Sequence, residues 1–127
     1  MSTIPISFNL SIQNLNENIS NLVDEFDQEE YIENVEVQSN LAIGETIVIA
    51  IATTLIKELI AKAPAAIKNF KELIHKIKNR ANKSTSKEED SKLTFTFRMK
   101  TIEIKNATDL ELDKFIEYIT KIQVSSM

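Results

Sequence analysis

The sequence predicts an α+β domain in which helices pack on a small mixed sheet of about four strands, in the order β-α-β-α-α-β-β-α. The chain has 127 residues, which suits one domain, residues 1–127, with a substantial core. Apolar residues make up 43% and charged residues 27%, as is typical of globular proteins. Apolar positions recur with period two in some stretches and with helical spacing in others, which predicts strands and helices in alternation.

The N-terminal part predicts a strand and then a helix. Every second residue from Ile4 to Ile12 is apolar, the pattern of a half-buried strand, and Pro5 lies near its start, where a missing N–H donor is tolerated. Helical spacing follows, and Asn14 or Asn16 is expected to cap that helix. Its apolar positions are Leu15, Ile19, Leu22, Val23 and Phe26. A short second strand is predicted at 34–38, after an acidic loop.

The most apolar stretch, TIVIAIATTLI at 46–56, decides the architecture. Its uncharged run of 11 residues is too short for a membrane-spanning helix, which needs about 20 residues. Burial of each Ile or Leu gains about 1.5–3 kcal/mol, which exceeds the lower helix propensity of β-branched residues. We therefore predict a buried helix over 44–62, with a membrane-inserting segment and a strand as alternatives. The apolar pairs that favour it are Ile47/Val48, Ile51/Ala52, Leu55/Ile56 and Leu59/Ile60.

Pro64 is expected to begin another helix, at about 64–81, because proline fits the first helical position. Whether the chain kinks or reverses at Pro64 is open. The inner stripe is Ile67, Phe70, Leu73, Ile74 and Ile77. The remaining surface would carry Lys68, Lys71, His75, Lys76, Lys78 and Arg80. The polar tract NKSTSKEEDSK at 82–92 is predicted to be a mobile surface loop.

The C-terminal part predicts a hairpin and a final helix. In LTFTFRMKTIEIKN, a two-residue turn at 99–100 would place Phe97 opposite Ile102 and Phe95 opposite Ile104. Residues 108–111, TDLE, form a capping box that opens the helix. Its inner positions are Leu112, Phe115, Ile116, Ile119 and Ile122.

Charge is segregated along the chain. Residues 1–56 contain nine acidic side chains and no Lys or Arg, a net charge of −9. Residues 57–87 contain nine basic and two acidic side chains, a net charge of +7. These surfaces could solvate the fold or pair with each other, or they could form a docking face for a protein, including a second copy of the chain. Neither nucleic acid nor a membrane is favoured as a partner, because the overall charge is −4 and aromatic residues do not interleave with the lysines.

Recognisable catalytic and cofactor motifs are missing from the sequence. The absence of cysteine excludes disulfides and thiolate metal sites, and a single glycine excludes glycine-rich phosphate loops. His75 has no triad context, and the segment DEFDQEE lacks the glycine of a calcium-binding loop. We therefore expect a protein that is not an enzyme and has no cofactor or metal. The N-terminus lacks the features of a secretory signal, which favours a cytoplasmic protein.

The order of segments resembles the effector-associated constant component family of bacterial conflict systems. The segments are the strand ISFNLSI, the helix ending near DEFDQEEYIENVEV, the long apolar region from 43 to 80, the hairpin LTFTFRMKTIEI and the final helix after NATD at 106–109. Residues 70–80 stand where the family's helix closes in an aromatic and then basic residues. The chain departs from the family in having Phe70 rather than Trp, one glycine in the helix, and only Ser39 and Asn40 in place of a proline-rich loop.

The resemblance implies a non-catalytic adaptor of a bacterial anti-phage system, which couples a sensing or switching module to an effector such as a peptidase. We expect it to bind its partner through the basic surface 68–80 and the acidic segment 24–36. The candidate partner-binding residues are Lys68, Lys71, Lys76, Lys78, Arg80, Asp24, Asp27, Glu29 and Glu30. Changing Lys71, Lys76 and Lys78 to Glu is expected to abolish co-purification with the partner at about 0.15 M salt and to leave the fold intact. A membrane-active effector that inserts residues 44–62 and a small phage-encoded inhibitor are the alternatives.

Overall fold

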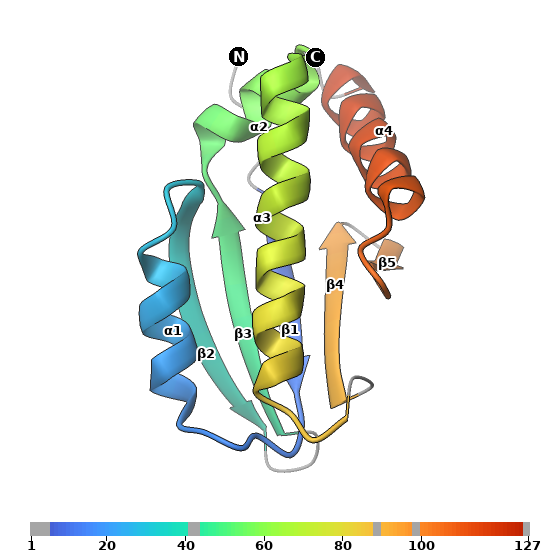
Figure 1. The fold of residues 1–127 in the computed structure, drawn as a ribbon. Coiled ribbons are helices and arrows are strands. Elements are labelled where there is room, and N and C mark those ends of the chain that lie inside the picture. The colour runs from blue at the N-terminus through green and yellow to red at the C-terminus, as the bar shows by residue number, and fades with distance from the viewer. Residues whose placement is uncertain (1–5, 41–43, 88–89, 98–99, 126–127) are drawn as a thin grey trace.

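The computed structural model describes residues 6–40, 44–87, 90–97 and 100–125. Four helices and a five-stranded antiparallel sheet make up this part of the chain (Figure 1). The elements are β1 (Ser7–Ile12), α1 (Ile19–Asp27), β2 (Ile32–Asn40), β3 (Gly44–Ile51), α2 (Thr53–Ile60), α3 (Pro64–Lys83), β4 (Ser91–Phe97), β5 (Lys100–Glu103) and α4 (Asp109–Ser125). The strand order is β2-β3-β1-β4-β5, so β1 lies at the centre and β2 and β5 form the edges.

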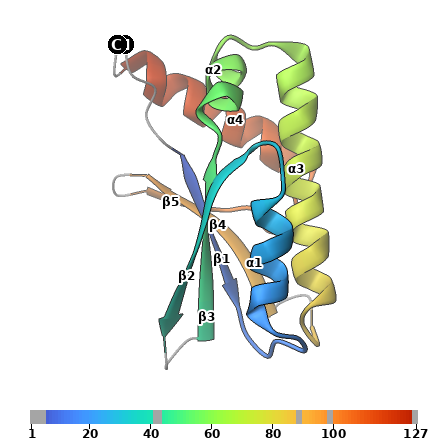
Figure 2. The same cartoon turned by 90° about the vertical axis from the view of Figure 1, so that its left-hand side faces the viewer.

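The helices α1 and α3 cover one face of the sheet, and the core lies between these layers (Figure 2). Apolar and polar side chains alternate along β1, so they lie on opposite faces of the sheet. Phe8, Leu10 and Ile12 are buried toward the helices, whereas the intervening polar residues are half-buried on the other face. The predicted α+β class is therefore confirmed, but the sheet is antiparallel rather than mixed and has five strands rather than about four. The element order is β-α-β-β-α-α-β-β-α.

The predicted helix over 44–62 is wrong. Residues 44–51 form β3, and only residues 53–60 form the helix α2. Ile47, Ile49 and Ile51 are 0%, 0% and 2% exposed, and they alternate with half-buried positions in the period-two pattern of a strand. The intervening residues Val48 and Ala50 are also apolar, which hid that alternation in the sequence. Tertiary pairing with β1 and β2 suits the β-branched side chains, which favour strands over helices.

The chain reverses near Pro64 instead of kinking. Residues 61–63 separate α2 from α3, and Lys62 there adopts a left-handed conformation with φ 59°. Pro64 occupies the first turn of α3, as predicted, and α3 then descends along the sheet (Figure 2). Three of its predicted inner residues, Phe70, Ile74 and Ile77, are at most 1% exposed. The helix extends to Lys83, two residues beyond the predicted end.

The predicted polar loop at 82–92 is largely part of regular or buried structure. Residues 82–83 belong to α3 and 91–92 to β4, while residues 88–89 lie outside the described residues. Ser84 is 0% exposed and Thr85 is 7% exposed. Thr85 also forms a bridge with Leu15, which lies ahead of α1 rather than within it. The predicted cap of α1 is wrong, because the amide oxygen of Asn18, not of Asn14 or Asn16, accepts from the Ser20 N–H at 3.0 Å.

The predicted hairpin exists, but its register differs by two residues. Phe95 pairs with Ile102 and Phe97 with Lys100, rather than Phe95 with Ile104 and Phe97 with Ile102. A shift of two residues leaves every side chain on its own face of the sheet, so the apolar pattern cannot distinguish the two registers. The intervening residues 98–99 lie outside the described part of the chain.

The predicted capping box of α4 is confirmed. The Glu111 N–H donates to Thr108 Oγ1 at 3.3 Å, and the Thr108 N–H donates to Glu111 Oε1 at 3.2 Å. The same carboxylate accepts from the N–H groups of Lys105 and Asn106 at 2.9 and 3.1 Å. Burial disfavours the charged form of Glu111, but these backbone hydrogen bonds outweigh it and lower its pKa. The inner residues Leu112, Phe115, Ile116 and Ile119 are buried, and the side chain of Ile122 is outside the described set.

Gly44, the only glycine in the chain, begins β3 in a conformation that other residues rarely adopt. Its φ is +88°, and a Cβ atom built there would lie 2.7 Å from the carbonyl oxygen of Ile12. We expect Gly44→Ala to lower the free energy of unfolding by about 2 kcal/mol, because it combines a strained φ with a backbone clash. Urea denaturation followed by circular dichroism measures the change. Thr46→Ala, in the same strand, is the control and should lose less than about 1 kcal/mol. A Gly44→Ala variant as stable as the parent protein would contradict this account of Gly44.

Candidate protein-docking surface

Arg80 joins the C-terminal part of α3 to α1 and to Glu17, which lies just before α1. Its Nη1 and Nη2 donate to the two carboxylate oxygens of Glu17 at 2.8 and 2.7 Å, and its Nε donates to Glu25 at 2.6 Å. Ser84 completes the cluster, since its Oγ accepts from Arg80 at 2.7 Å and donates to Glu17 at 3.0 Å. The side chains of Arg80 and Glu17 are 22% and 21% exposed, so solvent screens this pair only partly. The guanidinium is therefore occupied within the fold.

This cluster changes the ionisation of Glu17. The hydrogen bond from Arg80 is the main cause that lowers its pKa from 4.5 to about 2; burial opposes the shift, and Ser84 reinforces it. The pKa of Arg80 is raised in turn, chiefly by its hydrogen bonds with Glu17 and Glu25. Both groups thus remain charged throughout the physiological pH range.

Glu17 should make stability depend on pH under acidic conditions. A carboxyl whose pKa is lower in the folded state stabilises the protein above its unfolded pKa, here 4.5, and that contribution is lost as the pH falls toward about 2. We expect Glu17→Gln to be less stable than the parent protein at pH 6, with the difference shrinking between pH 4.5 and 2. Urea denaturation across this range measures it. Glu58→Gln, at an exposed position of α2, is the control and should follow the parent curve. A Glu17→Gln difference that stays constant with pH would contradict the assignment.

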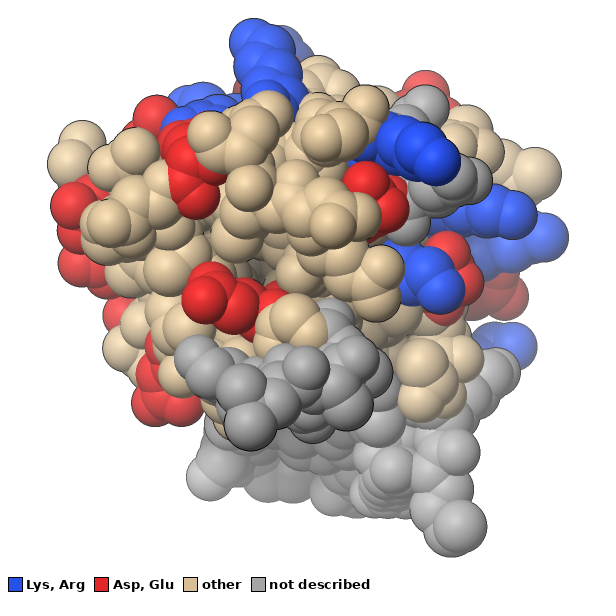
Figure 3. All heavy atoms as spheres, turned by 90° about the horizontal axis from the view of Figure 1, so that it is seen from below, with Lys and Arg blue, Asp and Glu red and all other residues tan. Residues whose placement is uncertain are grey.

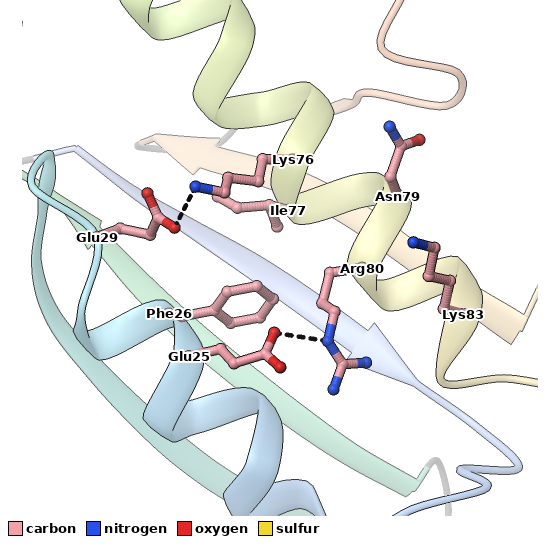
Figure 4. Close-up of a pocket in the computed structure, with 8 residues that line it drawn as sticks. All are labelled: Glu25, Phe26, Glu29, Lys76, Ile77, Asn79, Arg80 and Lys83. Atoms are coloured by element: carbon pink, nitrogen blue, oxygen red, sulfur yellow. Dashed lines mark hydrogen bonds and ion pairs between the residues drawn. The ribbon is translucent and has the colours of Figure 1, made fainter.

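Two lysines of α3 also form ion pairs within the molecule. Lys76 Nζ lies 2.7 Å from Glu29 Oε1, and Lys71 Nζ lies 2.7 Å from Asp113 Oδ1 on α4. The first pair bridges a shallow pocket of about 240 Å³ between α1 and α3 (Figure 4). The pocket is lined by Glu25, Phe26, Glu29, Lys76, Ile77, Asn79, Arg80 and Lys83. Because Glu25 and Glu29 already pair with Arg80 and Lys76 across it, both carboxylates in this pocket are compensated without a ligand.

Lys78 is not on the surface, contrary to the prediction. It is 5% exposed, and its Nζ donates to the carbonyl oxygen and the hydroxyl of Ser91, at 2.8 and 3.3 Å. It therefore cannot contact a partner directly. Lys78 follows the buried Ile77 and so lies at the margin of the apolar stripe of α3. At that position the helical spacing does not indicate whether a lysine is buried or exposed.

These contacts also correct the expected effect of reversing Lys71, Lys76 and Lys78. Two of the three lysines hold carboxylates on other elements and the third is buried, so glutamates at these positions would place like charges together and a charge in the core. The triple reversal would destabilise the fold rather than leave it intact. Within the predicted basic set, Lys68 alone is exposed and makes no ion pair with a described residue.

Acidic residues, by contrast, remain uncompensated along α1 and β2. Asp24, Asp27 and Glu30 of the predicted set are exposed and form no ion pair with any residue that the structure describes, whereas Glu29 pairs with Lys76. Glu33 and Glu36 on β2 are also exposed and without an ion pair in the described ranges. We refer to the set Asp24, Asp27, Glu30, Glu33 and Glu36 as the acidic edge. Viewed from below, many acidic side chains lie on the left, the side of α1 and β2 in Figure 1, whereas most basic ones lie at the top and on the right, where further acidic side chains adjoin them (Figure 3).

Sequence reasoning predicted part of this arrangement. The lack of any Lys or Arg in residues 1–56 indicated the acidic surface, including the positions of Glu33 and Glu36. Sequence reasoning did not predict that Glu17 and Ser84 hold Arg80, because no local pattern links residues more than 60 positions apart. Whether the acidic and basic segments pair or stay free depends on the packing of α1 beside α3, which only the tertiary structure provides.

The described residues provide no metal centre or membrane-crossing helix. No cluster of three or more His, Cys, Asp or Glu side chains among them has the arrangement needed to hold a metal ion. No helix in the described ranges combines the length and the apolar character needed to cross a membrane. Comparison with protein-family models, curated proteins and solved structures finds no match for the chain. The resemblance to the effector-associated constant component family therefore stays a prediction.

Proposed function

We propose that the protein is a non-catalytic adaptor of a bacterial defence system, which binds an effector or switch protein through the acidic edge. The observation that carries the binding role is the contrast between the two charged surfaces. Lys71, Lys76 and Arg80 are held by carboxylates of the same chain, while the five carboxylates of the acidic edge have no cationic partner in the described structure. The role in defence rests on the resemblance described above.

The acidic edge has the properties of a steering and docking surface. Five carboxylates on adjoining elements produce a negative field that accelerates encounter with a basic surface and disfavours acidic partners. Exposed charges of this kind contribute little to the stability of the free protein. Their concentration at one edge therefore suits recognition of a basic partner better than it suits folding. The membrane-active alternative depended on a helix over 44–62, and the structure divides that segment between β3 and α2.

Co-purification with the products of neighbouring genes tests this function. We expect one of them, a peptidase or a nucleotide-switch protein, to co-purify with the parent protein at about 0.15 M salt. The triple variant Asp24→Asn, Asp27→Asn, Glu30→Gln should lose that partner, because three carboxylates of the acidic edge are neutralised.

A matched variant removes three positive charges from exposed lysines. Lys57→Gln, Lys68→Gln and Lys83→Gln alter side chains without an ion pair to a described residue, and this variant should retain the partner. Both variants should unfold at urea concentrations close to that of the parent protein. Binding that follows the lysines instead of the acidic edge, or the failure of every neighbouring product to co-purify, would contradict the proposal.

A further inference from the structure

We propose that the outer edge of β2 accepts an extended basic segment of a partner protein as a sixth strand of the sheet. This inference deepens the proposed function, on which it rests, by assigning the binding mode and the chemistry of the partner. β2 is the terminal strand of the order β2-β3-β1-β4-β5, and β3 is its only strand neighbour in the described structure. In an antiparallel pair every second residue directs its N–H and C=O groups away from the neighbouring strand. The outer side of β2 thus offers a row of backbone donors and acceptors.

The usable part of this edge is residues 34–40. They pair with β3 in one uninterrupted register, from Asn34 opposite Ala50 to Asn40 opposite Gly44. The register shifts between Ile32 and Asn34, where Glu33 is the extra residue of a bulge that ends the regular ladder. Seven residues with a regular backbone match the length of a short strand. No proline or lysine, the usual means of blocking an edge, occurs in β2.

The two faces of this edge differ in chemistry. On the face toward the helices, Val35 is half-buried and Val37 is 40% exposed, and α1, which contacts β2, carries the half-buried Ile19 and Val23. On the opposite face, Asn34, Glu36 and Gln38 are exposed and polar. Because side chains alternate along a strand, an added strand that matches both faces would have apolar residues at every second position, with basic residues between them. The apolar ones would cover Val35 and Val37, and the basic ones would approach Glu36.

Charge favours a basic segment over a second copy of this chain. Two β2 edges placed side by side would bring Glu33, Glu36 and the rest of the acidic edge against their own copies, which like-charge repulsion disfavours. Six of the fifteen basic residues of this chain lie in α3, where they are helical, and three of these six form ion pairs with described residues. A partner segment rich in Lys or Arg alternating with Val or Ile meets both requirements of the edge.

A synthetic heptapeptide with lysine at odd and valine at even positions tests the inference. Fluorescence anisotropy of the labelled peptide gives the affinity, and amide resonances of the isotopically labelled protein locate the contact. We expect saturable binding with the largest shifts in residues 34–40. Glu36→Lys should weaken binding at least tenfold, because it replaces an attraction by a repulsion. Glu117→Lys, an identical change at an exposed site on α4, should change it less than twofold.

Methylation of the peptide nitrogens separates strand addition from simple charge attraction. One peptide has alternate nitrogens methylated, and its counterpart has the other set methylated, so that only one of the two loses the N–H groups that face β2. We expect one methylated peptide to lose binding at least tenfold and the other to bind like the unmethylated one. Equal affinities of the two, retained or lost, would overturn strand addition. Co-purification through the acidic edge would still stand in that case, so the two proposals fail separately. A dimer of the protein that Glu36→Lys dissociates would assign the edge to a second copy and also overturn the inference.

Discussion

Phe115→Ala is expected to lower the free energy of unfolding by about 4 kcal/mol, the largest effect of any single substitution considered. Phe115 is 1% exposed, and its ring centroid lies 4.7 Å from that of Phe95, 5.1 Å from Phe8 and 5.6 Å from Phe70. The four rings come from α4, β4, β1 and α3, so truncation of Phe115 leaves a cavity where these four elements meet. The loss of stability has two causes: the apolar ring is no longer buried, and its contacts with the three other rings are removed.

Urea denaturation measures this loss, and Phe115→Leu provides the control. Leucine refills much of the space, so we expect that variant to lose only about 1.5 kcal/mol. Two equal losses would show that the cavity contributes little, because both variants lose the aromatic contacts and only the alanine variant opens a large cavity. A Phe115→Ala loss below about 1 kcal/mol would contradict the packing of α4 against the sheet, because full burial of a phenylalanine cannot be removed so cheaply.

Ile49→Ala should lower the free energy of unfolding by about 3 kcal/mol, the second largest effect. Ile49 is 0% exposed, and it pairs with Phe8 on one side and Val35 on the other. Its neighbour Val48 points to the opposite face of the sheet and is only half-buried. Val48→Thr should therefore lose less than about 1 kcal/mol, since a hydroxyl there can reach solvent.

This pair of variants discriminates the observed strand from the expected helix. In a helix over 44–62, the pairs Ile47/Val48 and Ile51/Ala52 would face the core, so Val48→Thr would be the costly change and Ile49→Ala the mild one. In β3 the order is reversed. A greater loss for Val48→Thr, measured by urea denaturation of both variants side by side, would contradict the strand.

The fold was predictable where the apolar pattern was unambiguous. The strand β1, the start of α3 at Pro64 and the capping box at Thr108 and Glu111 follow from local chemistry, and all three are confirmed. Residues 44–51 were mispredicted because both parities are apolar in a strand that lies inside the sheet, so periods of two and 3.6 fit the same letters. The hairpin register failed for a related reason, since a shift of two residues preserves every face.

The candidate site was predictable as a charge imbalance but not as a surface. The sequence indicates that opposite charges lie in separate halves, and it cannot indicate which of them meet. Arg80 reaches Glu17 across 63 positions, and Lys78 is buried, although it looks like any other lysine of α3 in the sequence. Of the predicted partner-binding residues, Asp24, Asp27 and Glu30 stay exposed without an ion pair to a described residue, against one lysine, Lys68. We therefore propose the acidic edge rather than α3 as the binding surface.

A double-mutant cycle between Glu17 and Arg80 tests the central claim, that the segregated charges are joined inside the fold. The free energies of unfolding of the parent protein, Glu17→Ala, Arg80→Ala and the double variant give the coupling energy of the pair. A bidentate pair with side chains only 21% and 22% exposed should couple by more than about 1 kcal/mol, above the value usual for exposed pairs. A coupling below about 0.3 kcal/mol would show that Glu17 does not hold Arg80 inside the fold, and would contradict the account.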